Sequence, residues 1–213
     1  MNILKNILHN TPKGTGIIIN AETEAYPEIF ALQIIKNVLT ENKKIVYASF
    51  HPRSRRVMQS LGKHQNHLFK IIEMNFGQDI VAEYSCSSQL YEVNITLRNI
   101  RKEFGPEFII VDSLNSLIAY NDVKDVLKFF IESIEEAVKF NTIELFIFDN
   151  RTQPENISRF LNSISNGIIN LTTDNRGFTM HICKIVGTDF IHETHNYKVQ
   201  IDNSDYWNSS INF

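Results

Sequence analysis

The chain has 213 residues, 43% of them hydrophobic, and a formal net charge of −3. This length and apolar content suit a single globular domain over residues 1–213, and the small net charge gives no signal for a strongly acidic or basic partner. The two cysteines lack zinc-site spacing and no apolar run approaches the roughly 18 residues of a membrane span, so we expect a cytoplasmic protein with no membrane partner and no metal.

Apolar runs alternate with helical patterns, which is typical of βαβ units around a largely parallel sheet. A strand is predicted at 17–19, followed by a polar loop and a helix that begins at Pro27, where a proline loses no hydrogen bond. Further strands are predicted at 45–50, 71–76, 108–112 and 143–149. Helices are predicted at 52–61, 88–104, 122–140 and 154–165. In the helix at 122–140, the spacing predicts a buried stripe of Val123, Val126, Phe130, Ile134 and Val138.

From residue 168 the pattern changes to shorter strands, predicted at 168–171, 178–186 and 197–201. Turn residues at 174–177 separate the first two, which predicts an antiparallel extension at one edge of the sheet. The predicted fold class is therefore α/β, with a mostly parallel central sheet, flanking helices and a C-terminal antiparallel strand extension.

Five short segments, in order along the chain, carry a family resemblance. They are FALQII (30–35), IVYASFHP (45–52), SLG (60–62), IIVDSLNSL (109–117) and KIVGT (184–188). On these segments the chain resembles the KaiC and RadA-like branch of the RecA-fold ATPases over nearly its whole length. The resemblance implies a RecA-like P-loop NTPase fold, in which the loop after the first strand binds the phosphates of the nucleotide.

That loop carries none of the residues that a GxxxxGK[ST] phosphate loop needs. In the register set by its flanks, Ala21 and Tyr26 stand at the two glycines, Pro27 at the lysine and Glu28 at the hydroxyl. Tyr26 adds bulk where glycine lets the backbone approach phosphate, and Pro27 removes a backbone donor. The chain is therefore identified as a degenerate member of the branch, without an intact Walker A motif.

Acidic residues add to this loss, since Glu22 and Glu24 flank Thr23 in the loop and Glu28 follows it. Carboxylates repel phosphate, so we expect no cofactor, although weak binding of ATP and Mg²⁺ stays open. The alternative is that these acids are solvated loop and first-turn residues, with Glu28 favourable at the start of the helix.

Two further strand ends belong to the expected site. Asp112 corresponds, by the resemblance, to the acid that positions Mg²⁺ in active relatives; the alternative is a local hydrogen-bonding role. Ser113 has no recognisable His/Asp setting, so no nucleophile and no catalytic residue are predicted. Asp149, with Asn150 and Arg151, ends another core strand at the edge where α/β folds bind ligands.

The resemblance also points to a changed catalytic base and a changed subunit contact. His51 and Pro52 occupy the position of the family's catalytic glutamates. Lys184 is retained as an intersubunit candidate, whereas Val186 replaces the arginine that would reach a neighbouring subunit's nucleotide. Val186 is either part of a rebuilt subunit contact or a strand residue turned inward.

The densest basic segment contains Arg53, Arg55 and Arg56. It is either a patch for nucleic acid or an acidic partner, or a solvated helix face, and the lack of interleaved aromatic residues favours the solvated face. His192 and His195 are three residues apart with no third ligand nearby, so we expect a surface pair and not a metal site.

Together these changes predict a catalytically inactive RecA/KaiC-like ATPase homologue that acts as a regulatory or protein-interaction subunit. We expect a homo-oligomer, or a hetero-oligomer with an active RecA/KaiC-like relative. The expected vestigial nucleotide site consists of Ala21, Glu22, Thr23, Glu24, Tyr26, Pro27, Glu28, Asp112, Ser113 and Asp149. Two alternatives stay open: a divergent ATPase that uses Asp112, Ser113 and Lys184 and is completed by a partner subunit, and a nucleic-acid-binding adaptor that uses the basic segment.

Overall fold

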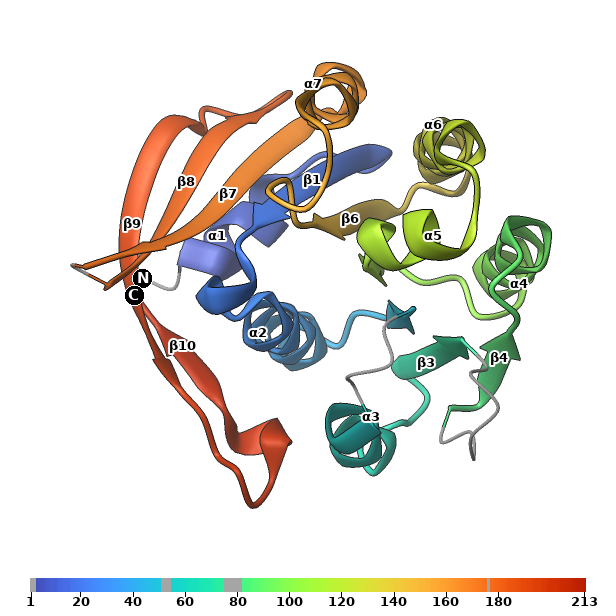
Figure 1. Ribbon diagram of the computed structural model, residues 1–213. Helices are drawn as coiled ribbons and strands as arrows, with labels where there is room; N and C mark the ends of the chain where they lie inside the picture. Colours follow the sequence, from blue (N-terminus) through green and yellow to red (C-terminus); the bar gives the residue numbers. More distant parts are fainter. Residues whose placement is uncertain (1–2, 51–54, 75–81, 176) are drawn as a thin grey trace.

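The computed structural model describes residues 3–50, 55–74, 82–175 and 177–213 (Figure 1). Across these residues the strands form a ten-stranded sheet in the order β10-β9-β8-β7-β1-β6-β5-β2-β3-β4. The strands are β1 (Thr15–Ala21), β2 (Ile45–Ser49), β3 (Phe69–Met74), β4 (Tyr84–Cys86), β5 (Phe108–Asp112), β6 (Ile143–Phe148), β7 (Gly167–Asp174), β8 (Gly177–Ile185), β9 (Ile191–Gln200) and β10 (Ser210–Asn212).

The strands from β7 to β4 in this order run parallel, and β8, β9 and β10 continue the sheet antiparallel beyond β7. The predicted α/β class, a mostly parallel sheet with an antiparallel C-terminal extension, is confirmed. One boundary differs, because β7 pairs parallel with β1 and the extension starts only at β8. The helix between β6 and β7 brings the chain back to begin a parallel strand, as crossover connections do.

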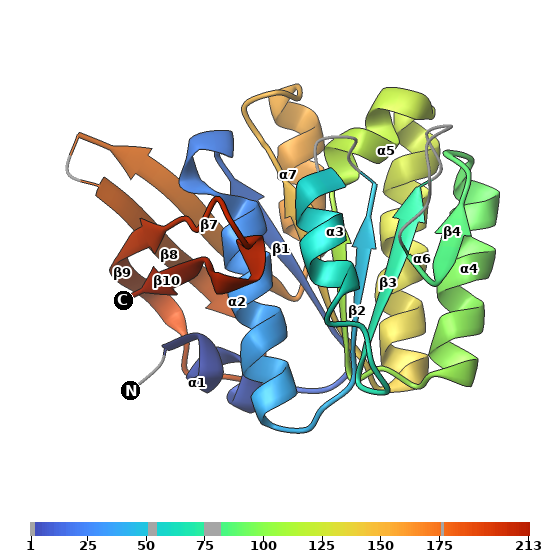
Figure 2. The same ribbon diagram turned by 90° about the horizontal axis from the view of Figure 1, so that it is seen from below.

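Helices cover both faces of the sheet, as Figure 2 shows from below. One face carries α1 (Ile3–Asn10), α2 (Pro27–Thr40) and α3 (Arg55–Gly62). The other carries α4 (Leu90–Glu103), α5 (Leu114–Tyr120), α6 (Val123–Phe140) and α7 (Glu155–Ile164). Within the described residues, none of these helices combines the length and the apolar character that a membrane crossing requires.

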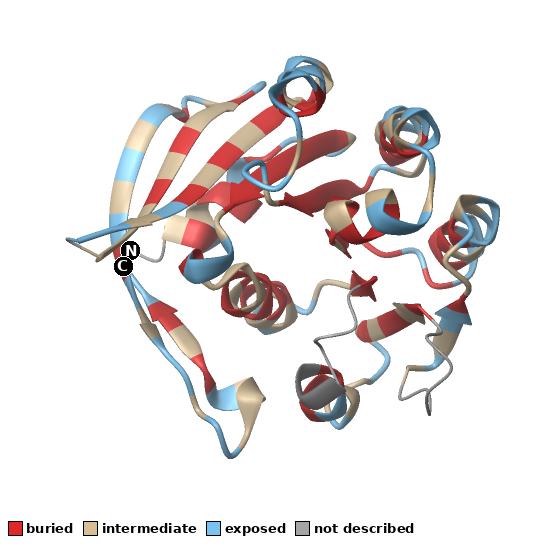
Figure 3. Cartoon of the chain, in the orientation of Figure 1, coloured by how far each residue is buried: buried red, intermediate tan, exposed pale blue. Residues whose placement is uncertain are grey.

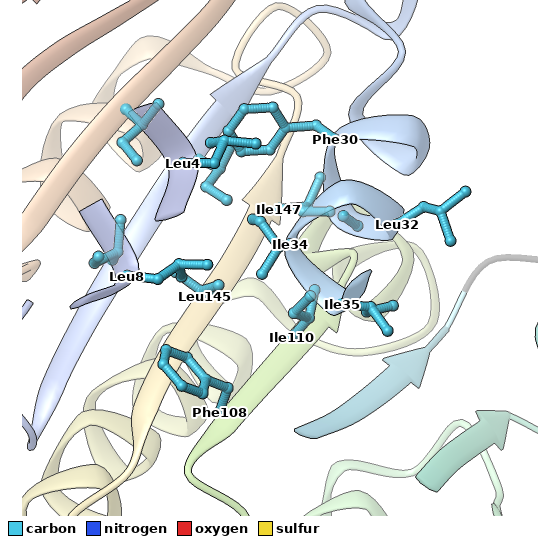
Figure 4. Close-up of a cluster of buried hydrophobic side chains, with 14 of the residues drawn as sticks. Leu4, Leu8, Phe30, Leu32, Ile34, Ile35, Phe108, Ile110, Leu145 and Ile147 are labelled. Atoms are coloured by element: carbon cyan, nitrogen blue, oxygen red, sulfur yellow. The ribbon is translucent and has the colours of Figure 1, made fainter. Parts of the chain in front are cut away.

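Strand alternation divides the apolar side chains between two cores. Ile17 and Ile19 of β1 face the first helical layer, while Ile18 between them faces the second. The central parallel strands are therefore buried on both faces (Figure 3). Figure 4 shows part of the first core, where side chains of α1 and α2 lie against the central strands; those labelled are Leu4, Leu8, Phe30, Leu32, Ile34, Ile35, Phe108, Ile110, Leu145 and Ile147.

Several element predictions are confirmed and others are wrong. The helix α2 begins at Pro27, and β5 has the predicted bounds. The burial predicted for Val138 is wrong, because this residue is 61% exposed and its neighbour Ala137 is buried. The elements α1, β4, α5 and β10 were not predicted; each has eight residues or fewer, too few for a clear periodic pattern.

Candidate functional site

The carboxyl ends of β1, β5 and β6 meet at one edge of the sheet, where parallel α/β folds bind ligands. Ala21 ends β1, Asp112 ends β5, and Asp149 follows β6. Two groups of polar side chains form at this edge. One surrounds the turn after β1, and the other surrounds Asp112.

The turn after β1 is a single turn of 3₁₀-helix, η1 (Thr23–Ala25). The Ala25 N–H donates to the Glu22 carbonyl at 2.9 Å, and the Tyr26 N–H donates to the Thr23 carbonyl at 3.4 Å. Tyr26 adopts a left-handed conformation, with φ 55° and ψ 56°, and α2 starts directly after it at Pro27. The N–H groups of Ala25 and Tyr26 are thus used within the turn, and Pro27 has no N–H group. These three residues therefore do not supply the ring of backbone donors that cradles a phosphate.

Aromatic side chains fasten this turn to the antiparallel strands. The Tyr197 hydroxyl in β9 donates to the Ala25 carbonyl at 2.9 Å. The Tyr26 ring packs edge-on against Phe178 of β8 with centroids 5.7 Å apart, and Phe178 stacks on Tyr197 at 5.4 Å. Burial raises the pKa of the Tyr197 hydroxyl, which therefore remains a donor. The shape of the turn is held by residues far from it in the sequence.

Arg151 joins the acidic residues around the turn. Its guanidinium pairs with Glu24 and lies 3.7 Å from a Glu22 carboxylate oxygen and 3.8 Å from one of Asp149. The Thr23 hydroxyl donates to Asp149 Oδ2 at 3.0 Å. The hydrogen bond from Arg151 lowers the pKa of Glu24, and the same bond raises the pKa of Arg151. We call these five residues, Glu22, Thr23, Glu24, Asp149 and Arg151, the Arg151 cluster.

Asn115 in α5 fixes the strand end that carries Asp149. Its Oδ1 accepts from the Asp149 N–H at 2.7 Å, and its Nδ2 donates to the Asp149 carbonyl at 2.9 Å and to the Thr152 hydroxyl at 2.8 Å. Sequence reasoning missed this residue, although it lies within the segment IIVDSLNSL that carried the resemblance. The available signal was a polar amide three residues after the end of a buried strand.

Asp112 and Ser113 make local contacts. Asp112 accepts a short hydrogen bond from the Tyr47 hydroxyl. Burial raises the pKa of Asp112, and the bond from Tyr47 opposes the shift. Ser113 is the N-cap of α5, where its side chain accepts from the Ser116 N–H. A carboxyl that is held by Tyr47 and has a raised pKa is a weaker ligand for Mg²⁺ than an open, ionised carboxylate.

The chain returns to this edge through residues 201–209, the segment between β9 and β10. Tyr206 lies in its short helix η3 (Tyr206–Asn208), and within the described part of the chain its buried hydroxyl has no hydrogen-bond partner. Burial raises the pKa of Tyr206, and the charges of Glu28 and Asp112 add to the effect.

Contacts with α2 and α3 hold this returning segment in place. The Trp207 N–H donates to the Ser60 hydroxyl at 2.9 Å, and the indole stacks on His64 with ring centroids 4.1 Å apart. Lys36 donates to the Ser209 carbonyl at 2.9 Å and lies over the Trp207 ring, 5.6 Å from its centroid. Sequence reasoning missed the segment because the strand that follows it has only three residues.

The other predicted residues lie apart from these two groups. Lys184 in β8 lies opposite Ile168 in β7, and Ile168 lies opposite Ile18 in the middle of β1. Lys184 is therefore level with the middle of β1 and not with the carboxyl end of that strand. Val186 follows β8 and is 58% exposed, so the alternative in which it turns inward is wrong. His195 Nε2 lies 3.2 Å from Glu193 Oε2, and the residues that the structure describes contain no group of three or more His, Cys, Asp or Glu placed to hold a metal ion.

The basic segment lies partly outside the described residues. Arg53 lies outside the described residues, as do His51 and Pro52. Arg55 and Arg56 begin α3, but their side chains also fall outside the described part.

No protein-family model matches this chain, and no curated protein sequence matches it significantly. Among solved structures, it is similar to a KaiC-like protein from the hyperthermophilic archaeon Pyrococcus horikoshii OT3. The TM-score is 0.67 at 15% sequence identity, and the match covers 95% of this chain and 91% of the other. The fold is therefore that of a KaiC-like, RecA-type protein.

Proposed function

We propose that this chain is a RecA/KaiC-like domain that does not hydrolyse ATP and acts in the cytoplasm as a regulatory or protein-interaction subunit. The likeness to a KaiC-like protein supports the architecture. The Arg151 cluster is the observation that carries the proposal, since it occupies the strand-to-helix turn where this type of fold brings phosphates to a helix N-terminus.

The Arg151 cluster disfavours a triphosphate in two ways. Arg151 is shared by Glu22, Glu24 and Asp149, so its charge is already more than neutralised. A triphosphate in the turn meets these carboxylates as well, and like charges repel at short range. Because the cluster is partly exposed, salt screens this repulsion, and the missing lysine and backbone donors are the larger loss.

The surroundings of Asp112 also favour a subunit that does not hydrolyse ATP over a divergent ATPase. Mg²⁺ in nucleotide sites is bound through one or two carboxylates together with the phosphates. For Asp112 to do this, its hydrogen bond from Tyr47 has to break. That hydrogen bond supports a structural use of this carboxyl.

The surface after β8 supports a role as a subunit. Val186 is exposed there, at the position that the family resemblance assigns to a subunit contact, and Lys184 lies two residues before it. We propose that the partner is a second copy of this chain or an active RecA/KaiC-like relative.

Calorimetric titration with Mg²⁺-ATP tests the loss of nucleotide binding. We expect no saturable heat, and the Arg151→Ala variant serves as a control in which the cluster is opened without restoring the phosphate loop. Micromolar affinity of the parent chain would support the divergent ATPase in its place.

Light scattering and affinity capture from the source organism test the subunit role. We expect a homo-oligomer, or co-purification of a RecA/KaiC-like relative. A strict monomer that captures no such relative contradicts the proposal. Salt-sensitive retention of RNA or single-stranded DNA, weakened by Arg53/Arg55/Arg56→Ala, would instead support the adaptor.

A further inference from the structure

A cavity of about 400 Å³ lies between α4 and α6. These two helices stand side by side in both ribbon views and cover the face of the sheet opposite α2 (Figures 1 and 2). No residue of the Arg151 cluster lines the cavity. Its volume falls in the range of sites that bind small molecules.

Polar pairs bridge the two helices along this cavity. Asn94 Nδ2 in α4 donates to Glu132 Oε2 in α6 at 3.5 Å, and one turn later Arg98 donates to Glu136 Oε1 at 3.2 Å. Beneath them the buried Arg101 reaches the sheet. The seam is thus polar over successive helical turns, where neighbouring helices in a core usually meet through apolar side chains.

Three buried oxygen atoms near this seam have no hydrogen-bond partner within the described residues: Ser133 Oγ, Glu136 Oε2 and Glu144 Oε2. Ser133 is 2% exposed and lines the cavity, as does Glu136. Buried polar atoms are rarely left without a partner, and a carboxylate oxygen can only accept. A hydrogen-bond donor placed in the cavity would therefore satisfy Glu136 Oε2 and could also bond to Ser133 Oγ.

The charge of the cavity wall favours a cation. The carboxylates on the wall are Glu132, Glu135 and Glu136, and the cations are Arg98 and Arg101. Arg101 is already paired with a carboxylate in the sheet, so it does not balance the wall. Lys128 and Lys139 pair with Glu132 and Glu136 from the exposed outer surface, where water screens these pairs. Within the described residues, Glu136 Oε2 is left without a partner.

We propose that this cavity binds a small organic cation with a guanidinium or ammonium group. The cationic group donates to Ser133 Oγ and to Glu136 Oε2. Its apolar stem lies against Tyr91 and Ile95, which line the same cavity and are 73% and 42% exposed.

Titration of the isotope-labelled chain with agmatine, followed by NMR, tests this site. We expect saturable shifts confined to α4 and α6, with a dissociation constant of about 1 mM or below at physiological salt. The uncharged 1,4-butanediol is expected to cause no saturable shift. Shifts that do not saturate, or that spread over acidic residues elsewhere, overturn the proposal.

Matched variants separate the cavity from general attraction to acidic surface. Ser133→Ala and Glu136→Gln are each expected to weaken agmatine binding by about tenfold. Glu155→Gln, which removes an exposed carboxylate from α7, is expected to leave it unchanged. Circular dichroism confirms that each variant is folded, and equal affinity of the parent and both cavity variants overturns the proposal.

Discussion

Arg101 in α4 donates two hydrogen bonds to a single carboxylate oxygen of Glu144 in β6, at 2.9 and 2.7 Å. The two side chains are 2% and 0% exposed, so the ion pair lies inside the protein. Such a pair adds little net stability, because removing both charges from water is costly. Removing only one partner is strongly destabilising, because it leaves a buried charge without compensation.

The variant Arg101→Leu is expected to lower the free energy of unfolding by about 3–5 kcal/mol. The double variant Arg101→Leu/Glu144→Leu is expected to recover most of that loss, because it removes both charges. Urea unfolding followed by circular dichroism measures both values. If the losses of the two single variants simply add in the double variant, the pair is not the coupled unit described above.

The effect of Asp112→Asn is expected to depend on pH. Burial raises the pKa of Asp112 above its ordinary value of 3.8, with the bond from Tyr47 opposing the shift. The contribution of this group to stability is therefore fully present below the unfolded pKa and is lost as pH rises through the folded pKa. Asparagine does not ionise, so the variant gains stability relative to the parent as pH rises. Urea unfolding from acid to neutral pH checks this, and a constant difference would contradict it.

Rebuilding the phosphate loop is expected to restore binding without turnover. The variant Ala21→Gly/Tyr26→Gly/Pro27→Lys/Glu28→Thr regains the glycines, the lysine and the hydroxyl of a phosphate loop. Its nucleotide affinity, measured with a fluorescent analogue, is expected to exceed that of the parent. Phosphate release is expected to stay at background, because His51 and Pro52 remain at the position to which the family resemblance assigns catalytic glutamates. Rapid turnover would mean that the base has been assigned to the wrong position.

Removing the hydroxyl that fastens the turn is expected to destabilise the chain modestly. Tyr197→Phe leaves the Ala25 carbonyl without its 2.9 Å hydrogen bond. We expect a loss of about 0.5–1.5 kcal/mol in the free energy of unfolding. Tyr91→Phe is the matched control, because Tyr91 is largely exposed, and its unfolding midpoint is expected to match that of the parent.

The two faces of α6 are expected to respond differently to substitution. Val138→Lys places a charge on an exposed position and is expected to change stability by no more than about 0.5 kcal/mol. Phe130→Ala removes a fully buried ring and is expected to cost about 3–5 kcal/mol. A large loss of unfolding free energy for Val138→Lys in urea unfolding would contradict the exposed position of this residue.

The parallel core could be predicted because its strands are buried on both faces and read as continuous apolar runs. Phe108–Asp112 and the helix starting at Pro27 are the clearest cases, since each has an unambiguous boundary residue. The prediction for Val138 was wrong because the apolar spacing of α6 fits either of two neighbouring stripes, one with Val138 and one with Ala137. Only the packing of α6 against β1 and β6 decides which of the two is buried.

The candidate site could be predicted only in part. The acids of the turn were visible in the sequence, but the pairing of Arg151 with Glu24 joins residues 127 positions apart. Nothing local to either residue indicates such a pair. The hydrogen bond from Trp207 to Ser60 joins residues 147 positions apart, and it depends on a segment without a periodic pattern of its own.

The only tryptophan of the chain, Trp207, lies in that returning segment and stacks on His64 of the region after α3. Its emission therefore senses a single location, the seam where the C-terminal segment rests on the first helical layer. Unlabelled protein thus carries an intrinsic optical probe, and a spectral change on adding a partner or a small molecule would report that this segment has lifted or tightened.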